Sequence, residues 1–113
     1  MSVTIYHNPR CSKSRQTLAI LEEKNIETTV VEYLTTPPSA AKLTSILSML
    51  GMKAKDIVRK KEAKEAGVDP AGLSQKDLIA AMVANPIMIE RPIVVAGDKA
   101  VMGRPPENVL TII

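Results

Sequence analysis

Apolar and polar positions follow the period of a β-strand near both ends of the chain and the period of a helix between them. Residues 2–6 alternate in strand fashion, and residues 28–33 are rich in β-branched side chains, so both segments are predicted to be strands. Apolar residues at helical spacing predict a helix over residues 12–24. A strand, a helix and a strand in about thirty residues predict a right-handed crossover between parallel neighbours.

The middle of the chain is predicted to be helical. Ser39 is the expected N-cap of a helix that Gly51 ends. Residues 54–66 follow as one broken helix or two short ones. Ser74 begins a third helix, which Pro86 ends.

The last part of the chain changes period again. Residues 92–96 predict a buried strand, Gly97-Asp98 a two-residue hairpin turn, and residues 99–102 the returning strand. Residues 103–107 are expected to open a short helix. The apolar side chains of that helix are predicted to face inward: Val109, Leu110 and Ile112.

Length and composition narrow the class of protein. The 113 residues predict one domain, 1–113, with a helical insert at about 39–85. The formal charge of +3 is spread along the chain and the only aromatic side chains are two tyrosines, so nucleic acid is not an expected partner. No apolar run has membrane-spanning length, and the chain becomes polar too early for a signal peptide. The expected location is the cytoplasm.

The stretch His7-Asn8-Pro9-Arg10-Cys11-Ser12-Lys13-Ser14-Arg15 carries the candidate chemistry. It holds the only cysteine and the only histidine, where the first strand gives way to the first helix. The free N–H groups of a helix start favour a thiolate and can also hold an oxyanion. A free cysteine is more often a small buried apolar residue. The polar neighbours of Cys11 make burial unfavourable, so we predict a reactive thiol.

The sequence alone does not decide the roles of the other candidate residues. His7 is as consistent with a loop histidine at the end of a strand as with a functional role. Arg59 lies in a basic run, which is usually the solvated face of a helix. Arg91 and Arg104 each precede a proline, which is unremarkable for surface arginines. Neither the residue types nor their spacing decide among these interpretations.

The order of elements, with a cysteine at the first helix start and an X-Pro bond before the third strand, resembles the thioredoxin-like fold. That resemblance implies an α/β fold with a small mixed four-stranded sheet, flanked by helices, and a helical insertion between strands two and three. Four blocks resemble the glutaredoxin-dependent arsenate reductase family, and most closely its shorter members: HNPRCSKSR, then VRKK around Arg59, ERPIVV around Arg91, and GRPPE around Arg104.

The resemblance implies roles for particular residues. Cys11 matches the nucleophile of that family, and His7 matches a histidine that supports ionisation of the thiol. Arg59, Arg91 and Arg104 match the arginines around the oxyanion, and the amides of the first helical turn would add donors: Ser12, Lys13 and Ser14. The resemblance also implies a cis bond before Pro92.

The implied reaction reduces arsenate, or a similar oxyanion, to arsenite through an adduct on Cys11. Glutathione is the implied co-substrate, and no bound cofactor or metal is expected. A single cysteine cannot form an internal disulfide, so glutaredoxin is the implied partner that regenerates the thiol. The chain is expected to act as a monomer, without a nucleic-acid or membrane partner.

Three alternatives differ in what they require of the sequence. The phosphatase-like arsenate reductases need an arginine six residues after the cysteine, where this chain has Thr17, and we set that class aside. Spx-type regulators, which bind RNA polymerase, use a Cys-x-x-Cys switch whose second position is Ser14 here. A glutathione-linked thiol oxidoreductase with a different substrate also stays open.

Overall fold

A four-stranded mixed sheet occupies the first and last parts of the chain in the computed structural model, which describes residues 2–113. The strands are β1 (Ser2–His7), β2 (Glu27–Glu32), β3 (Ile93–Ala96) and β4 (Lys99–Met102). Their order across the sheet is β2-β1-β3-β4. β1 is parallel to β2 and antiparallel to β3, and β3 is antiparallel to β4. The mixed four-stranded sheet predicted from the sequence is confirmed.

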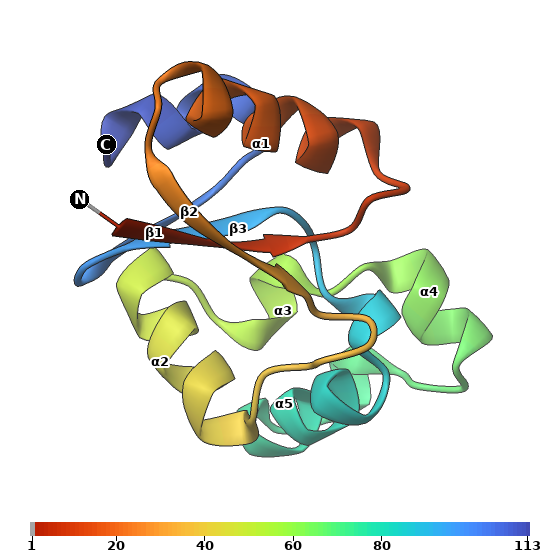
Figure 1. Ribbon diagram of the computed structural model, residues 1–113. Helices are drawn as coiled ribbons and strands as arrows, with labels where there is room; N and C mark the ends of the chain where they lie inside the picture. The colour runs from red at the N-terminus through yellow and green to blue at the C-terminus, as the bar shows by residue number, and fades with distance from the viewer. Residues whose placement is uncertain (1) are drawn as a thin grey trace. The chain divides into compact units, whose positions relative to one another are not determined.

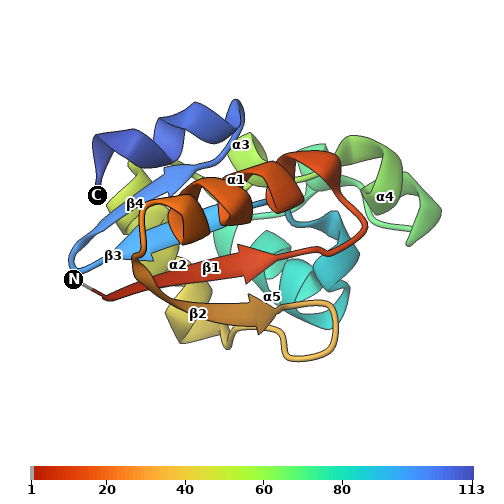
Figure 2. The same ribbon diagram turned by 45° about the horizontal axis from the view of Figure 1, so that its top comes forward.

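One face of this sheet carries the apolar core of the first and last segments. Figures 1 and 2 show α1 (Ser12–Glu23) and the C-terminal η3 (Pro106–Thr111) side by side along the sheet. The buried side chains on this face come from two strands, β1 and β3, and two helical elements: Val3, Ile5, Leu21, Val94, Ala96 and Val109. The alternating pattern of residues 2–6 arises because every second side chain of β1 enters this core.

The C-terminal segment departs from the prediction. It forms a 3-10 helix, η3, with Val109 fully buried and Ile112 half-buried, but Leu110 is 45% exposed. A 3-10 helix has three residues per turn, so positions 109 and 112 share a face and position 110 turns away. The prediction that Leu110 faces inward is therefore wrong.

Residues 37–90 form a second compact unit, apart from the unit made of residues up to 36 together with 91–113. Its helices are α2 (Ala40–Leu50), α3 (Ala54–Ile57), α4 (Lys60–Glu65) and α5 (Gln75–Ala84), with the short turns η1 (Pro70–Gly72) and η2 (Pro86–Met88). The predicted N-caps are confirmed, because Ser39 Oγ accepts the Lys42 N–H and Ser74 Oγ accepts the Asp77 N–H. Gly51 ends α2 in the left-handed conformation.

The predicted break within residues 54–66 is real. Val58 adopts extended backbone between α3 and α4 and forms a β-bridge with Ile89. The Arg59 N–H donates to the Met88 carbonyl across 2.7 Å, and the Glu90 N–H donates to the Ile57 carbonyl across 2.8 Å. These pairings with the 86–90 segment satisfy backbone groups that a continuous helix would have used.

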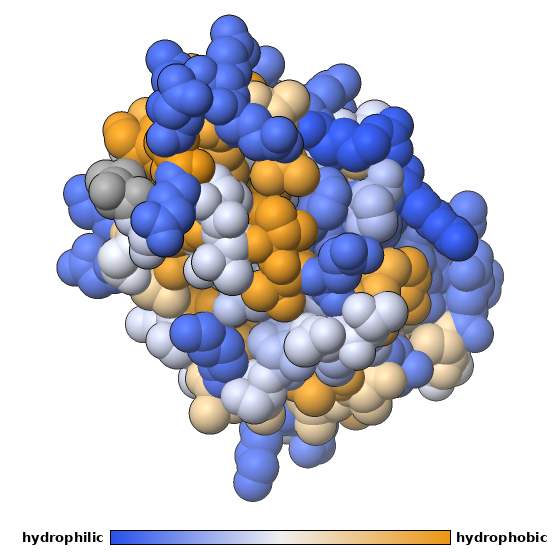
Figure 3. Space-filling view, in the orientation of Figure 1, coloured by the Kyte–Doolittle hydropathy of each residue, from blue (hydrophilic) through white to orange (hydrophobic). Residues whose placement is uncertain are grey.

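The edge strand β2 leaves apolar side chains at the surface. Val30 in this strand is 43% exposed. Figure 3 shows apolar atoms at the surface among hydrophilic side chains, in the orientation of Figure 1. Among residues 2–113, no helix is long and apolar enough to cross a membrane.

Candidate active site

A short turn after β1 places Cys11 at the N-cap of α1. The Cys11 N–H donates to the Asn8 carbonyl across 3.0 Å, and the Arg10 N–H donates to the Asn8 side-chain oxygen across 3.0 Å. Asn8 is buried, and asparagine before proline is a frequent turn former. Cys11 has extended backbone at the N-cap, so its side chain lies against the first turn of a twelve-residue helix.

The first turn of α1 stabilises the thiolate. Burial would raise the pKa of Cys11, but hydrogen bonds from the backbone N–H groups of Ser14 and Lys13 and from the Arg91 guanidinium outweigh it. The net effect holds the pKa of the Cys11 thiol below its ordinary value. The side chain is only partly buried, so reagents from solvent can reach it.

The sheet brings two arginines to the same place. Arg91 lies two residues before the start of β3 and Arg104 two residues after the end of β4, and the two strands form a hairpin in which Ile93 pairs with Met102. Ile93 also pairs with Tyr6 of β1. The end of β1 that leads to the thiol therefore lies beside the end of the hairpin that carries both arginines.

The distances agree with this topology. Arg104 Nη1 lies 3.8 Å from Cys11 Sγ and 3.3 Å from the Arg91 carbonyl oxygen. Arg104 is exposed at the mouth of the site, whereas Nε and Nη1 of Arg91 are buried. The bond between Arg91 and Pro92 is cis, the isomer that the resemblance implies, and the bond between Arg104 and Pro105 is cis as well. The Arg91 guanidinium is therefore the buried cation of the site, and the Arg104 guanidinium is the solvent-exposed one.

His7 reaches this site through a serine. Its side chain is buried, and Nδ1 is hydrogen-bonded to Ser14 Oγ at 2.6 Å. The same hydroxyl accepts the Asn8 N–H at 3.1 Å. Burial lowers the pKa of His7, Glu32 raises it and Arg15 lowers it, with a net decrease that favours the neutral imidazole. A neutral imidazole can orient the loop through Ser14, but it brings no positive charge to the sulfur.

The remaining predicted donors are the first three residues of α1, and they differ in exposure. Ser12 is exposed and begins α1, and Lys13 is half-buried. The side chain of Ser14 is fully buried and is used by His7 and Asn8. Of Ser14, the backbone N–H is thus the group directed at the sulfur. The N–H groups of Lys13 and Ser14 therefore point at the thiol, and their role toward an oxyanion stays a prediction.

Arg59 lies in the second compact unit, 37–90. It caps α4, and its Nε lies 3.2 Å from Glu62 and its Nη1 2.6 Å from Glu90. Burial lowers the pKa of Arg59, but both carboxylates raise it, and the net shift is upward. The basic run is therefore not uniform, since Lys60 and Lys61 are exposed while Arg59 is half-buried in ion pairs.

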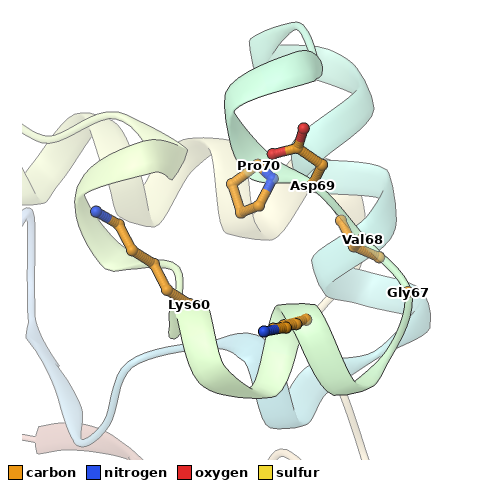
Figure 4. Close-up of a pocket in the computed structure, with 6 residues that line it drawn as sticks. Lys60, Gly67, Val68, Asp69 and Pro70 are labelled. Carbon is orange, nitrogen blue, oxygen red and sulfur yellow. The ribbon is translucent and has the colours of Figure 1, made fainter.

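Surface hollows in the second unit involve none of the predicted site residues. One of about 390 Å³ is lined by α4 and the segment after it: Lys60, Lys64, Gly67, Val68, Asp69 and Pro70 (Figure 4). A neighbouring hollow of about 210 Å³ shares Lys60 and Pro70 with it. Among residues 2–113, no group of three or more His, Cys, Asp or Glu side chains could hold a metal ion.

A thiol at the start of the helix that follows the first strand, in a mixed four-stranded sheet of order β2-β1-β3-β4, is the arrangement of a thioredoxin-like protein. The ArsC family model matches residues 6–112, and the chain belongs to that family. The Haemophilus influenzae arsenate reductase is 47% identical over 116 residues, covering 100% of both chains. The Escherichia coli protein YfgD, described as uncharacterized, is 54% identical over 98% of this chain and 96% of its own.

The fold of a solved relative agrees with these similarities. The structure of an arsenate reductase from Vibrio cholerae superimposes with a TM-score of 0.93 and 48% identity, covering 100% of this chain and 98% of that chain. The assignment to the arsenate reductase family made from the four sequence blocks is confirmed.

Proposed function

We propose that this chain reduces arsenate to arsenite, with Cys11 as the nucleophile and with glutathione and glutaredoxin as external reductants. The observation that supports this most strongly is the lowered pKa of Cys11 beside Arg91, with Arg104 Nη1 at 3.8 Å from the sulfur. The similarity to arsenate reductases of other bacteria supports the choice of substrate.

The electrostatic problem of the reaction explains this arrangement. Arsenate carries one to two negative charges near neutral pH and repels a thiolate. Guanidinium groups stay charged and bind tetrahedral oxyanions through two parallel donors. Arg91 and Arg104 would therefore hold the oxyanion, and the N–H groups at the start of α1 would add neutral donors. Arg59 is the third arginine implied by the family resemblance, and its part in the site is a proposal on that ground alone.

In the first step the Cys11 thiolate attacks arsenic(V), a sulfur–arsenic bond forms, and a protonated oxygen leaves as water. Glutathione sulfur then attacks the Cys11 sulfur. The electron pair of the sulfur–arsenic bond passes to arsenic, which leaves as arsenite, and the two sulfurs are oxidised to a mixed disulfide. Two thiols thus supply the two electrons. A thiol of glutaredoxin attacks the mixed disulfide and regenerates Cys11.

The cysteine count supports an external reductant. Cys11 is the only cysteine in the sequence, so the mixed disulfide cannot be resolved within this chain. Such a cycle requires a compartment that keeps glutathione reduced, which points to the cytoplasm. The same count argues against the Spx-type switch, whose second cysteine position is Ser14.

The decisive experiment measures arsenite formed by the purified protein with arsenate, glutathione and glutaredoxin. We expect turnover in the wild type and none in Cys11→Ser. Mass spectrometry of the stalled reaction without glutaredoxin should find glutathione on Cys11. Arsenite production no faster than in the Cys11→Ser control would contradict the proposal and favour a different substrate.

The pH dependence of the thiol is a separate prediction. Because the folded protein lowers the pKa of Cys11, the rate of alkylation by iodoacetamide should rise with a midpoint below that of the same thiol in the unfolded chain. The same shift stabilises the fold above the ordinary thiol pKa, and this contribution is lost as pH falls through the folded pKa. The wild type should therefore gain stability relative to Cys11→Ser as pH rises. A midpoint at or above that of the unfolded chain would contradict the proposed thiolate.

A further inference from the structure

Three segments of the thiol-bearing unit meet at Gly103, and neither Gly103 nor Thr17 is among the residues assigned above to the chemistry. The Gly103 N–H donates to the Pro92 carbonyl across 2.9 Å. On the other side, Thr17 Oγ1 lies 3.3 Å from the Gly103 carbonyl oxygen and 2.8 Å from the Lys13 carbonyl oxygen. Gly103 and Thr17 are both buried.

Gly103 is a glycine because of space and not because of an unusual backbone angle. A Cβ added there would lie 2.7 Å from Pro92 Cγ, 2.7 Å from Thr17 Oγ1 and 3.1 Å from Thr17 Cγ2. Real Cβ atoms do not approach other heavy atoms to 2.7 Å. The Pro92 ring is rigid, so it cannot move aside as a flexible side chain would. A larger residue at 103 must therefore push the chain away from α1 and from Pro92.

Each of the three segments leads directly to the site. Pro92 follows Arg91, Gly103 precedes Arg104, and Thr17 lies in the second turn of the helix whose start holds Cys11. A displacement of the chain at Gly103 would therefore carry Arg104 with it. The distances that depend on this contact are those from Arg104 Nη1 to Cys11 Sγ, 3.8 Å, and to the Arg91 carbonyl oxygen, 3.3 Å.

We propose that Gly103 and Thr17 are positioning residues, which fix Arg104 against Cys11 and so set the affinity of the site for a tetrahedral oxyanion. The Thr17 hydroxyl shares its one proton between the Lys13 carbonyl at 2.8 Å and the Gly103 carbonyl at 3.3 Å, which links α1 to the segment before Arg104, and Gly103 permits the close approach. This inference rests on the proposed oxyanion site, but it does not require that arsenate be the substrate. The proposal also assigns a role to Thr17, which occupies the position at which phosphatase-like arsenate reductases need an arginine.

The test uses inorganic phosphate as an unreactive tetrahedral oxyanion and measures how well it protects Cys11 from iodoacetamide. Gly103→Ala should weaken protection by roughly tenfold, the effect of losing one hydrogen bond to a charged group. It should also raise the pH midpoint of alkylation, because a cation moves away from the thiolate. Gly72→Ala is the matched control, since a Cβ there meets Asp69 Oδ2 at an ordinary 3.5 Å. That control should match the wild type.

The same substitution made in Arg104→Ala protein distinguishes an effect on the position of Arg104 from a general loss of structure. In Arg104→Ala protein, Gly103→Ala should cause no further loss of phosphate protection, because the group that it displaces is already absent. A loss of the same size in both backgrounds would overturn the proposal, and so would wild-type behaviour of Gly103→Ala by both measurements.

Two substitutions of Thr17 test the positioning role if Gly103→Ala does not fold. Thr17→Val keeps the shape and removes the hydroxyl, whereas Thr17→Ser keeps the hydroxyl and removes a methyl group. Positioning through the hydroxyl predicts a loss of phosphate protection of roughly threefold in Thr17→Val and none in Thr17→Ser. A packing role predicts the reverse order, and that result, or no change in either variant, would overturn the proposal.

The outcomes also separate this inference from the proposed function. If the wild type shows no phosphate protection, the oxyanion site fails, and the pH midpoint of Gly103→Ala still tests whether Arg104 is positioned against the thiolate. If phosphate protects but arsenate is not reduced, the function fails and the positioning result stands.

Discussion

The two compact units use arginine in opposite ways. In the unit that contains the sheet, Arg104 lies 3.8 Å from the Cys11 sulfur and the Arg91 guanidinium lowers the pKa of the thiol. In the unit of residues 37–90, Arg59 is paired with Glu62 and Glu90 at 3.2 and 2.6 Å. The positive charge acts on a reactive group in the first unit and is balanced by carboxylates in the second.

The difference shows that the neighbours of an arginine decide what its charge can do. A guanidinium that faces a thiol lowers the energy of the thiolate and leaves donors for a bound anion. The Arg59 guanidinium uses Nε for Glu62 and Nη1 for Glu90, so two of its five N–H donors go to carboxylates of the protein. An oxyanion bound by Arg59 would therefore meet a guanidinium whose charge is already balanced by two carboxylates. The following substitutions test the comparison, beginning with the largest expected effect.

Substitutions in the apolar cores of the two units should have the largest effect on stability. Leu21 in α1 and Leu78 in α5 are both fully buried. Truncating either to alanine should lower the free energy of unfolding by about 2–5 kcal/mol, through lost burial and a cavity. Denaturant unfolding followed by circular dichroism measures this. The proposed single domain predicts one transition that both variants shift. Two transitions, each moved by one variant only, would show that the units unfold independently.

The hydrogen bond between His7 and Ser14 should matter more to the fold than to the thiol. Ser14→Ala removes the hydroxyl that contacts the buried imidazole at 2.6 Å, so the free energy of unfolding should fall by about 1–3 kcal/mol. The backbone N–H of residue 14 remains, so the alkylation midpoint of Cys11 should stay close to that of the wild type. A large upward shift of that midpoint would show that the imidazole supports the thiolate through the serine hydroxyl.

Arg91→Lys keeps the charge and loses the planar fork. We expect oxyanion protection of Cys11 to weaken by about tenfold and the pKa of the thiol to rise, because a guanidinium hydrogen bond is lost. Arg10→Lys is the matched control, an exposed arginine of the same turn. Equal protection in both variants would mean that charge alone, without bidentate geometry, holds the anion.

Glu90→Gln should have the smallest effect. The Arg59 and Glu90 side chains are 24% and 28% exposed, and ion pairs open to solvent contribute little, so a loss of about 1 kcal/mol or less is expected. The pKa of Arg59 should fall, since Glu90 is one of the groups that raise it. Thermal unfolding gives the stability change. A loss as large as that of Leu78→Ala would show that the pair organises the unit of residues 37–90.

Most of the fold could be predicted because local signals agreed with tertiary packing. Ser39, Gly51 and Ser74 act where the capping rules place them. The 3-10 form of η3 could not be predicted, because Val109, Leu110 and Ile112 suit either helix type by composition. The segment packs against α1, a contact that the local sequence does not reveal.

Part of the candidate site could likewise be predicted from local sequence, and part of it could not. The reactive position of Cys11 follows from a polar stretch between a strand and a helix, which local sequence reveals. The closeness of Arg104 to the thiol follows from strand pairing between residues far apart in the chain, and only the family resemblance anticipated it. The use of the Ser14 hydroxyl by His7, and the contact of Thr17 with Gly103, depend on distances that no sequence pattern encodes.

The two ends of the β3–β4 hairpin differ in their distance along the strands from the candidate site. Its open end leads to Arg91 and Arg104, while its closed end is the exposed turn at Gly97 and Asp98, where Gly97 adopts a φ of 65°. Four paired residues on each strand separate the two ends. That turn is therefore a suitable place to attach a fluorophore or a short tag. A label there would report on the protein while leaving the thiol and its cations undisturbed.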